Sequence, residues 1–276
     1  MRVYRSLHTA RILLGGVAAA FLIWVTACNA GNPNVPSGGD PVRMSESETD
    51  IAKDLWLRRN QPREALGHAL DAVELDGENA EALHLVALLY LDLCRRSPDD
   101  CRLAEAERHA RAAVEVKRDY REAINTLGVV LIHRQKYDDA IAVLKPLTAD
   151  ILYQTPENAW GQLGWAYLEQ GALDAAIDAL SRAVAAQPMF CVGNFRLGLA
   201  HERRGEPAQA LAALDRALGT EDPGCRSLQE AYFARARVHS KLGQLDDARD
   251  DLDQCIALKR SSQTGKDCLS MTQKLK

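Results

Sequence analysis

The stretch Trp160-Gly-Gln-Leu-Gly-Trp-Ala-Tyr167 decides the fold of this chain. It is followed by Gly171, Ala176, Leu180, Ala183 and Pro188. Its small and large residues alternate as they do where two antiparallel helices interlock. Gly164 lets the helices approach closely, and the large side chains around it fill the remaining space. Gly171 suits the turn between the helices and Pro188 ends the second one. The segment therefore predicts a helix hairpin.

The same pattern recurs along most of the chain, with repeats that start near residues 46, 80, 121, 157, 191 and 229. We therefore expect an all-α protein, a right-handed superhelical solenoid of about six hairpins. It should occupy residues 46–260, with a C-terminal tail over 261–276. The spacing resembles the tetratricopeptide repeat, whose hairpins stack to bury a continuous core. The resemblance implies a scaffold that binds other proteins.

The N-terminal segment has the features of a secretory signal. Arg2, Arg5 and Arg11 precede an apolar run over residues 12–25, too short for a comfortable membrane span. The run leads into Val25-Thr-Ala-Cys28, which resembles the bacterial lipoprotein box. The resemblance implies that residues 1–27 are removed and that Cys28 carries lipid, including palmitate. An ordinary signal cleaved near Ala27 and an uncleaved anchor are the alternatives.

Residues 28–45 are rich in Asn, Gly, Pro and Ser and predict a flexible tether. Asn29, rather than Asp, follows Cys28, which favours the outer membrane with the protein facing the periplasm. Removal of residues 1–27 lowers the 34 Lys and Arg residues to 31 against 38 Asp and Glu, a net charge of −7. This balance argues against a nucleic-acid partner.

Six further cysteines fit an oxidising compartment. Two predicted hairpins each bring a pair to one end, which gives the candidate disulfides Cys94–Cys101 and Cys191–Cys225 and leaves Cys255 with Cys268. The alternative is six reduced thiols. The spacing contains no Cys-x-x-Cys and suits no zinc site, so we expect no metal.

No sequence motif predicts catalysis. Nucleophile-elbow, zinc-protease and phosphate-loop patterns are missing from the sequence. Acidic pairs such as Asp138-Asp139 begin predicted second helices, where negative charge suits the helix dipole. We expect no enzyme activity, no cofactor and no small-molecule substrate.

The predicted first helices carry an apolar stripe on the side that faces the inside of such a solenoid. The candidate partner-binding residues are Leu88, Leu91, Val129, Ile132, Trp165, Leu168, Phe195 and Leu199. A large apolar patch typically marks a partner site, and an amphipathic helix or a short apolar segment would fit it. The alternative is that some of these side chains pack between neighbouring helices. Trp165 and Phe195 are expected as anchors because aromatic residues dominate interface energies.

A lipoprotein signal, a short tether and six repeats together resemble the pilotins of type IV pilus systems, the PilF/PilW/Tgl group. The cysteine pairs and extended connections are most similar to Tgl of the myxobacteria. The resemblance implies an outer-membrane lipoprotein that helps subunits of the secretin PilQ assemble. Two alternatives are a BamD-like scaffold for outer-membrane protein insertion and an NlpI-like adaptor for peptidoglycan enzymes.

Overall fold

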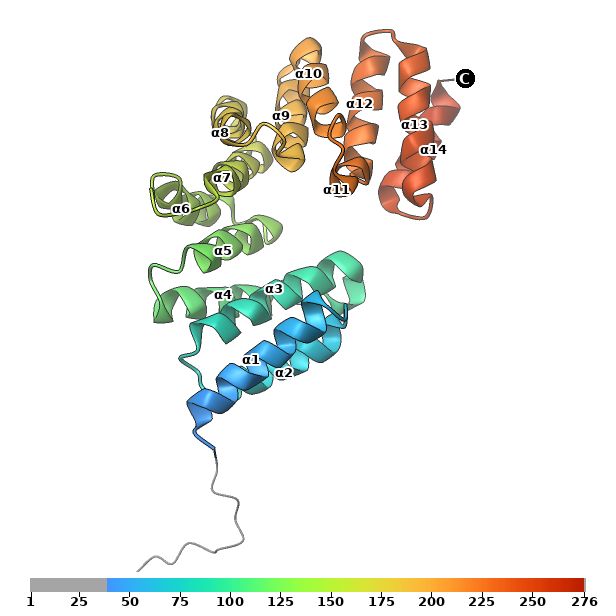
Figure 1. Ribbon diagram of the computed structural model, residues 1–276. Coiled ribbons are helices and arrows are strands. Elements are labelled where there is room, and N and C mark those ends of the chain that lie inside the picture. Colours follow the sequence, from blue (N-terminus) through green and yellow to red (C-terminus); the bar gives the residue numbers. More distant parts are fainter. Residues whose placement is uncertain (1–38, 276) are drawn as a thin grey trace, which may run out of the picture. The chain divides into compact units, whose positions relative to one another are not determined.

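The computed structural model describes residues 39–275, which form fourteen α-helices, one short 3-10 helix and no strand. The first helices of the six hairpins are α1 (Pro41–Leu57), α3 (Ala80–Arg96), α5 (Arg121–His133), α7 (Pro156–Gln170), α9 (Cys191–Arg204) and α12 (Gln229–Lys241). The second helices are α2 (Pro62–Leu75), α4 (Leu103–Val116), α6 (Tyr137–Leu147), α8 (Leu173–Ala186), α10 (Pro207–Leu218) and α13 (Leu245–Lys259). The chain also contains η1 (Pro98–Asp100), α11 (Pro223–Arg226) and α14 (Gln263–Lys274). The hairpins stack in chain order (Figure 1). The predicted signal peptide, Cys28 and most of the predicted tether lie outside the described residues.

Three consecutive hairpins close around the same contact between a glycine and a leucine. The pairs are Gly128 with Leu144, Gly164 with Leu180, and Gly198 with Leu214. A Cβ atom on any of these glycines would lie 2.5 to 2.6 Å from its leucine side chain. The leucines are completely buried. Only glycine allows the two helices to cross this closely, which explains the Leu-Gly pattern in the sequence.

Five of the six hairpins turn through a single residue with a left-handed backbone. These residues are Asn60, Gln135, Gly171, Gly205 and Gly243. Glycine adopts this conformation without steric cost, whereas a side chain at Gln135 makes it unfavourable. The second hairpin differs because a longer connection with η1 joins α3 to α4.

Three disulfides join the cysteine pairs named above, Cys94–Cys101, Cys191–Cys225 and Cys255–Cys268. The first closes the long connection of the second hairpin. The second joins the start of α9 to the short helix α11 that follows α10. The third joins α13 to α14.

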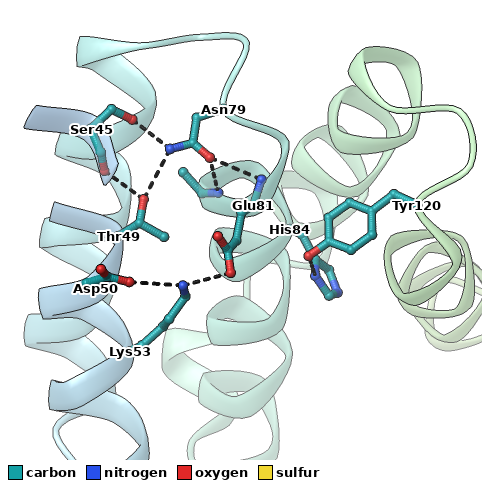
Figure 2. A network of polar contacts seen from close by, with 9 residues as sticks. Ser45, Thr49, Asp50, Lys53, Asn79, Glu81, His84 and Tyr120 are labelled. Atoms are coloured by element: carbon teal, nitrogen blue, oxygen red, sulfur yellow. Dashed lines mark hydrogen bonds and ion pairs between the residues drawn. The ribbon is translucent and has the colours of Figure 1, made fainter. Parts of the chain in front are cut away.

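A buried polar network joins the first two hairpins (Figure 2). The side-chain amide of Asn79 donates to Ser45 Oγ at 2.8 Å and to Thr49 Oγ1 at 3.3 Å. Its carbonyl oxygen accepts from the backbone N–H groups of Glu81 and Ala82 at the start of α3. Asn79 therefore caps one helix and fixes its position against α1 with the same side chain.

Helix α1 begins at Pro41, within the segment predicted as a flexible tether over residues 28–45. The Asp40 side chain caps the helix by accepting from the N–H of Val42, and Pro41 occupies the first turn. Ser45 and Thr49 are buried against the network around Asn79. The polar composition of this segment misled the prediction because its buried contacts are made by hydroxyl groups.

The predicted C-terminal tail contains helix α14, which packs against α12 and α13. Ser262 caps it by accepting from the N–H of Gly265. Cys268 is fully buried, and Met271 and Leu275 pack against the same cluster. The helix covers apolar surface that the last hairpin would otherwise expose, as terminal elements of repeat arrays do.

Candidate partner-binding groove

The first helices line the inner side of the stack in residues 39–275. Each contacts the first helices of the neighbouring hairpins as well as its own second helix. Second helices are joined mainly through the first helices that lie on either side of them. The first-helix side is consequently the shorter side of the stack, and we call it the groove.

The structure divides the eight predicted stripe residues into two groups. Ile132 and Leu168 are only 3% and 0% exposed and belong to the hydrophobic core. Their prediction as partner-binding residues is therefore wrong, because neighbouring hairpins pack closely enough to cover them. The other six side chains are half-buried on the first helices: Leu88, Leu91, Val129, Trp165, Phe195 and Leu199.

An apolar pocket of about 540 Å³ opens on the groove between α1, α3 and α5. Leu91 and Val129 from the predicted stripe line it, together with Trp56, Leu103 and the Cys94–Cys101 disulfide. The pocket exists because the long connection of the second hairpin turns back toward the groove and supplies a wall. Neither Trp56 nor the wall formed by the disulfide was singled out from the sequence, because both reach the pocket only through the stacking of neighbouring hairpins.

Asp92 organises the polar rim of this pocket. It accepts from the Trp56 indole N–H at 3.0 Å and forms ion pairs with Arg95 and Arg96 at 2.5 and 2.8 Å. Burial tends to raise the pKa of Asp92, but the hydrogen bonds from Arg95, Trp56 and Arg96 outweigh it and the pKa is lowered. The carboxylate therefore stays charged and holds the Trp56 ring in one orientation.

Trp165 lies at the middle of the groove between side chains from two neighbouring hairpins. The His133 and Trp165 rings form a T-shaped pair, with ring centroids 5.0 Å apart. The Arg196 guanidinium lies over its face, 4.2 Å from the ring centroid. The pKa of His133 is lowered by desolvation and then by the positive charge of Arg196. Neither His133 nor Arg196 was singled out from the sequence, because their contact with Trp165 depends on how three hairpins stack.

Phe195 and Leu199 lie next to this cluster on α9. Both pack at the margin of a core cluster formed by α10 and α12, and Leu199 also contacts the cluster of the preceding hairpin. They are thus held firmly on one side and remain partly open on the other. This suits side chains that present a fixed apolar surface to a partner.

The groove becomes charged at its C-terminal end. Glu202 on α9 forms ion pairs with Arg237 at 2.5 Å and Lys241 at 2.8 Å. A second cavity of about 540 Å³ follows, lined by Phe233, Met271 and Leu275 from α12 and the α14 end of the chain. The Glu202 cluster therefore forms a polar margin at this end of the groove.

One group of potential metal ligands lies in the described part of the chain, away from the groove. One ligand atom each from Glu48, His68 and Asp71 lies within 4.8 Å of the other two. His68 Nδ1 and Glu48 Oε2 are 2.6 Å apart and hydrogen-bond one another.

The tetratricopeptide-repeat profile matches residues 147–189 and 195–262 of the sequence. These ranges cover α7, α8, α10, α11, α12 and α13 and most of α9. They include the Gly164–Leu180 and Gly198–Leu214 contacts. Residues 147–189 and 195–262 thus match tetratricopeptide repeats.

Solved structures with tetratricopeptide repeats share the fold over most of the chain. The crystal structure of PilW, described as a widely conserved type IV pilus biogenesis factor, has a TM-score of 0.66 and 23% identity. The similarity covers 82% of this chain and 98% of PilW. PilF of Pseudomonas aeruginosa has a TM-score of 0.62 at 16% identity, covering 84% and 99% of the two chains.

A tetratricopeptide-repeat protein from Parabacteroides merdae has a TM-score of 0.66 at 16% identity, covering 83% of this chain and 84% of that one. A search among curated protein sequences gives no significant match. No helix within residues 39–275 is long and apolar enough to cross a membrane. The tetratricopeptide-repeat fold supports a role in protein interaction.

Proposed function

We propose that this protein is a pilotin, an outer-membrane lipoprotein that helps a type IV pilus secretin to assemble. The single observation that carries the proposal is the likeness to PilW and PilF over almost their whole lengths. Within this group we propose that the protein is most like Tgl. The support is that three disulfides, each within a hairpin or between neighbouring elements, and extended connections accompany the shared repeats.

The groove supplies a physical basis for this activity. A secretin subunit has to keep apolar segments from water until it joins its ring, and exposed apolar surface is costly. The half-buried side chains of the groove and the pocket beside Trp56 offer such a segment a dry surface. Release occurs when contacts between secretin subunits bury the segment more completely than the groove does.

Val129 gives the sharpest test because its side chain lines the pocket without belonging to a core cluster. Val129→Asp places a charge where the secretin segment would bind, and an uncompensated charge is expensive to desolvate. We expect loss of secretin multimers in cells in which this variant is the only copy. Val116→Asp is the matched control, because Val116 is 44% exposed at the end of α4.

Circular dichroism must show that both variants fold. Normal multimers with a folded Val129→Asp protein would rule out binding of the secretin in this groove. Trp165→Ala or Phe195→Ala should weaken binding of secretin peptides by roughly 2 kcal/mol, about thirtyfold, if these residues are hot spots.

The membrane anchor is tested separately at Cys28, which lies outside the described residues. Cys28→Ala should abolish labelling by a fatty-acid analogue and release the protein from the outer-membrane fraction, because the lipid attached to Cys28 is the proposed membrane anchor. Cys94→Ala is the control and should keep the labelling, since the sulfur of Cys94 is bonded to Cys101 in a disulfide. An unlabelled wild-type protein would refute the lipoprotein assignment.

A further inference from the structure

Arg196 differs from Arg95 and Arg237 of the groove in having no ion-pair partner among residues 39–275. Arg95 pairs with Asp92, and Arg237 pairs with Glu202. Arg196 instead uses only Nη1, which donates to Gln162 Oε1 at 2.9 Å and to the carbonyl oxygen of Gly161 at 3.4 Å. Its Nε and Nη2 donors have no hydrogen-bond or ion-pair partner within residues 39–275.

The position of the guanidinium is fixed although these donors are free. Its plane lies over the Trp165 ring, 4.2 Å from the centroid, and Nη1 is tied to α7 on one side. The side chain is partly buried. Burial lowers the pKa of Arg196 to about 9, and the more distant Glu169 only partly offsets it. Glu169 itself pairs with Arg203 at 3.5 Å.

A fixed guanidinium with an open Nε and Nη2 edge presents two parallel N–H donors, the geometry that carboxylates bind in a bidentate manner. From this arrangement we infer that Arg196, held on Trp165, is a binding site for the carboxylate of an aspartate or glutamate side chain on the partner segment. The inference rests on the proposed function and specifies the chemistry of the partner.

The location within the groove favours a side chain over a terminal carboxylate. Apolar residues continue on both sides of the cluster, with Leu91 and Val129 toward the N-terminus and Leu199 toward the C-terminus. A segment that covers this stripe must pass over Arg196 and continue beyond it. The partner should therefore carry an acidic residue within an apolar or amphipathic segment.

Titration with acetyl-glutamate α-amide tests the site in the purified full-length protein, with acetyl-glutamine amide as the uncharged control. NMR signals of the His133 ring and of the Trp165 indole report on binding, because both rings contact the cluster. We expect the glutamate probe to shift both signals and to raise the pKa of His133, since an anion offsets the charge of Arg196. The glutamine probe should change neither.

Arg196→Gln should abolish the response to the glutamate probe. Arg196→Lys keeps the charge but lacks the planar fork, and we expect it to bind the probe roughly tenfold more weakly. If Arg196→Gln lowers the melting temperature of the protein, Arg196→Lys serves as the test of the carboxylate site in its place. Equal responses to both probes in the wild type, or an unchanged response in a folded Arg196 variant, would overturn the inference.

Overlapping peptides of the secretin encoded in the same genome separate this inference from the proposed function. Wild-type protein should bind a peptide in which Glu→Gln or Asp→Asn costs about tenfold in affinity, and the same change should cost little with Arg196→Gln. If affinity is lost only when the peptide's free C-terminal carboxylate is blocked, the assignment to a side-chain carboxylate is contradicted.

If the glutamate probe binds but no secretin peptide does, the secretin is rejected as the partner and the carboxylate site is retained. Secretin peptides that bind equally with and without their acidic residues reject the carboxylate site alone.

Discussion

Gly164 on α7 lies directly against Leu180 on α8, so closely that a Cβ atom on Gly164 would be 2.5 Å from Leu180 Cγ. The same relationship recurs one repeat earlier and one repeat later. It sets the distance between the two helices of each central hairpin. Because Leu180 is fully buried, it has no open space into which it can move.

Gly164→Ala is therefore expected to destabilise the protein by about 1–3 kcal/mol through overpacking, and Gly164→Leu by more. Gly67→Ala is the matched control, because a Cβ atom at Gly67 meets nothing within 4 Å and the residue lies in α2. This control should gain up to about 1 kcal/mol from helix propensity. Urea unfolding measures both, and equal effects of the two changes would contradict the close contact.

Gln135→Gly should stabilise the protein by about 0.5–1 kcal/mol. Gln135 has φ of 59° at a turn where three other hairpins have glycine, and its side chain disfavours this backbone conformation. Gln254→Gly, at an exposed position within α13, should instead cost about 1 kcal/mol. A destabilised Gln135→Gly variant would show that the side chain makes a contact that outweighs the strain.

The Cys191–Cys225 disulfide should contribute about 3–4 kcal/mol to the free energy of unfolding, because it closes a long loop in the unfolded chain. The double change Cys191→Ala with Cys225→Ala should remove this contribution in urea unfolding. Removal of Cys94–Cys101, which closes a much shorter loop, should cost less on the same model. Peptide mapping of non-reduced protein from the periplasm should recover all three links, and free thiols at these positions would refute them.

His84 should make the stability depend on pH. It is buried, and its ring nitrogens lie 3.1 Å from Tyr120 Oη and 2.8 Å from Thr126 Oγ1 (Figure 2 shows the contact with Tyr120). Burial lowers the pKa of His84 from 6.5 to about 4, although Glu122 and Glu81 oppose the shift. The folded protein thus disfavours the charged ring that the unfolded chain carries below its own pKa.

The contribution of neutral His84 to the free energy of unfolding is fully present above pH 6.5, and it is lost as the pH falls from 6.5 toward 4. The loss amounts to about 3 kcal/mol, since one pKa unit corresponds to about 1.4 kcal/mol. His84→Gln should remove this part of the pH dependence while that of the carboxylates remains. Identical stability profiles for the wild type and His84→Gln between these pH values would contradict a neutral buried His84.

Leu91 and Leu168 occupy equivalent places in two first helices and should respond differently to alanine. Leu168 is fully buried, so Leu168→Ala should destabilise the protein by about 2–5 kcal/mol. Leu91 is half-buried and lines the pocket, so Leu91→Ala should cost clearly less stability and act mainly on partner binding. Thermal melts compare the two directly, and equal losses would place Leu91 in the core.

The repeated units and their internal contacts follow from the sequence because they are local. Gly164 and Leu180 are separated by one turn between two helices, so their spacing alone brings them together. The cysteine pairs are likewise close along the hairpin frame, and the structure joins the same residues. The left-handed turns at Gly171, Gly205 and Gly243 were marked by the residue type.

The surface of the groove depends on the tertiary structure because it is shared between hairpins. Whether Leu168 is buried while Leu91 remains open is set by the distance and angle between neighbouring first helices, and by the long connection beside α3. The contact of Trp165 with His133 and Arg196 joins three hairpins, and no spacing within one repeat predicts it. Helix α14 forms for the same reason: its few apolar residues become sufficient only where the last hairpin offers a surface to cover.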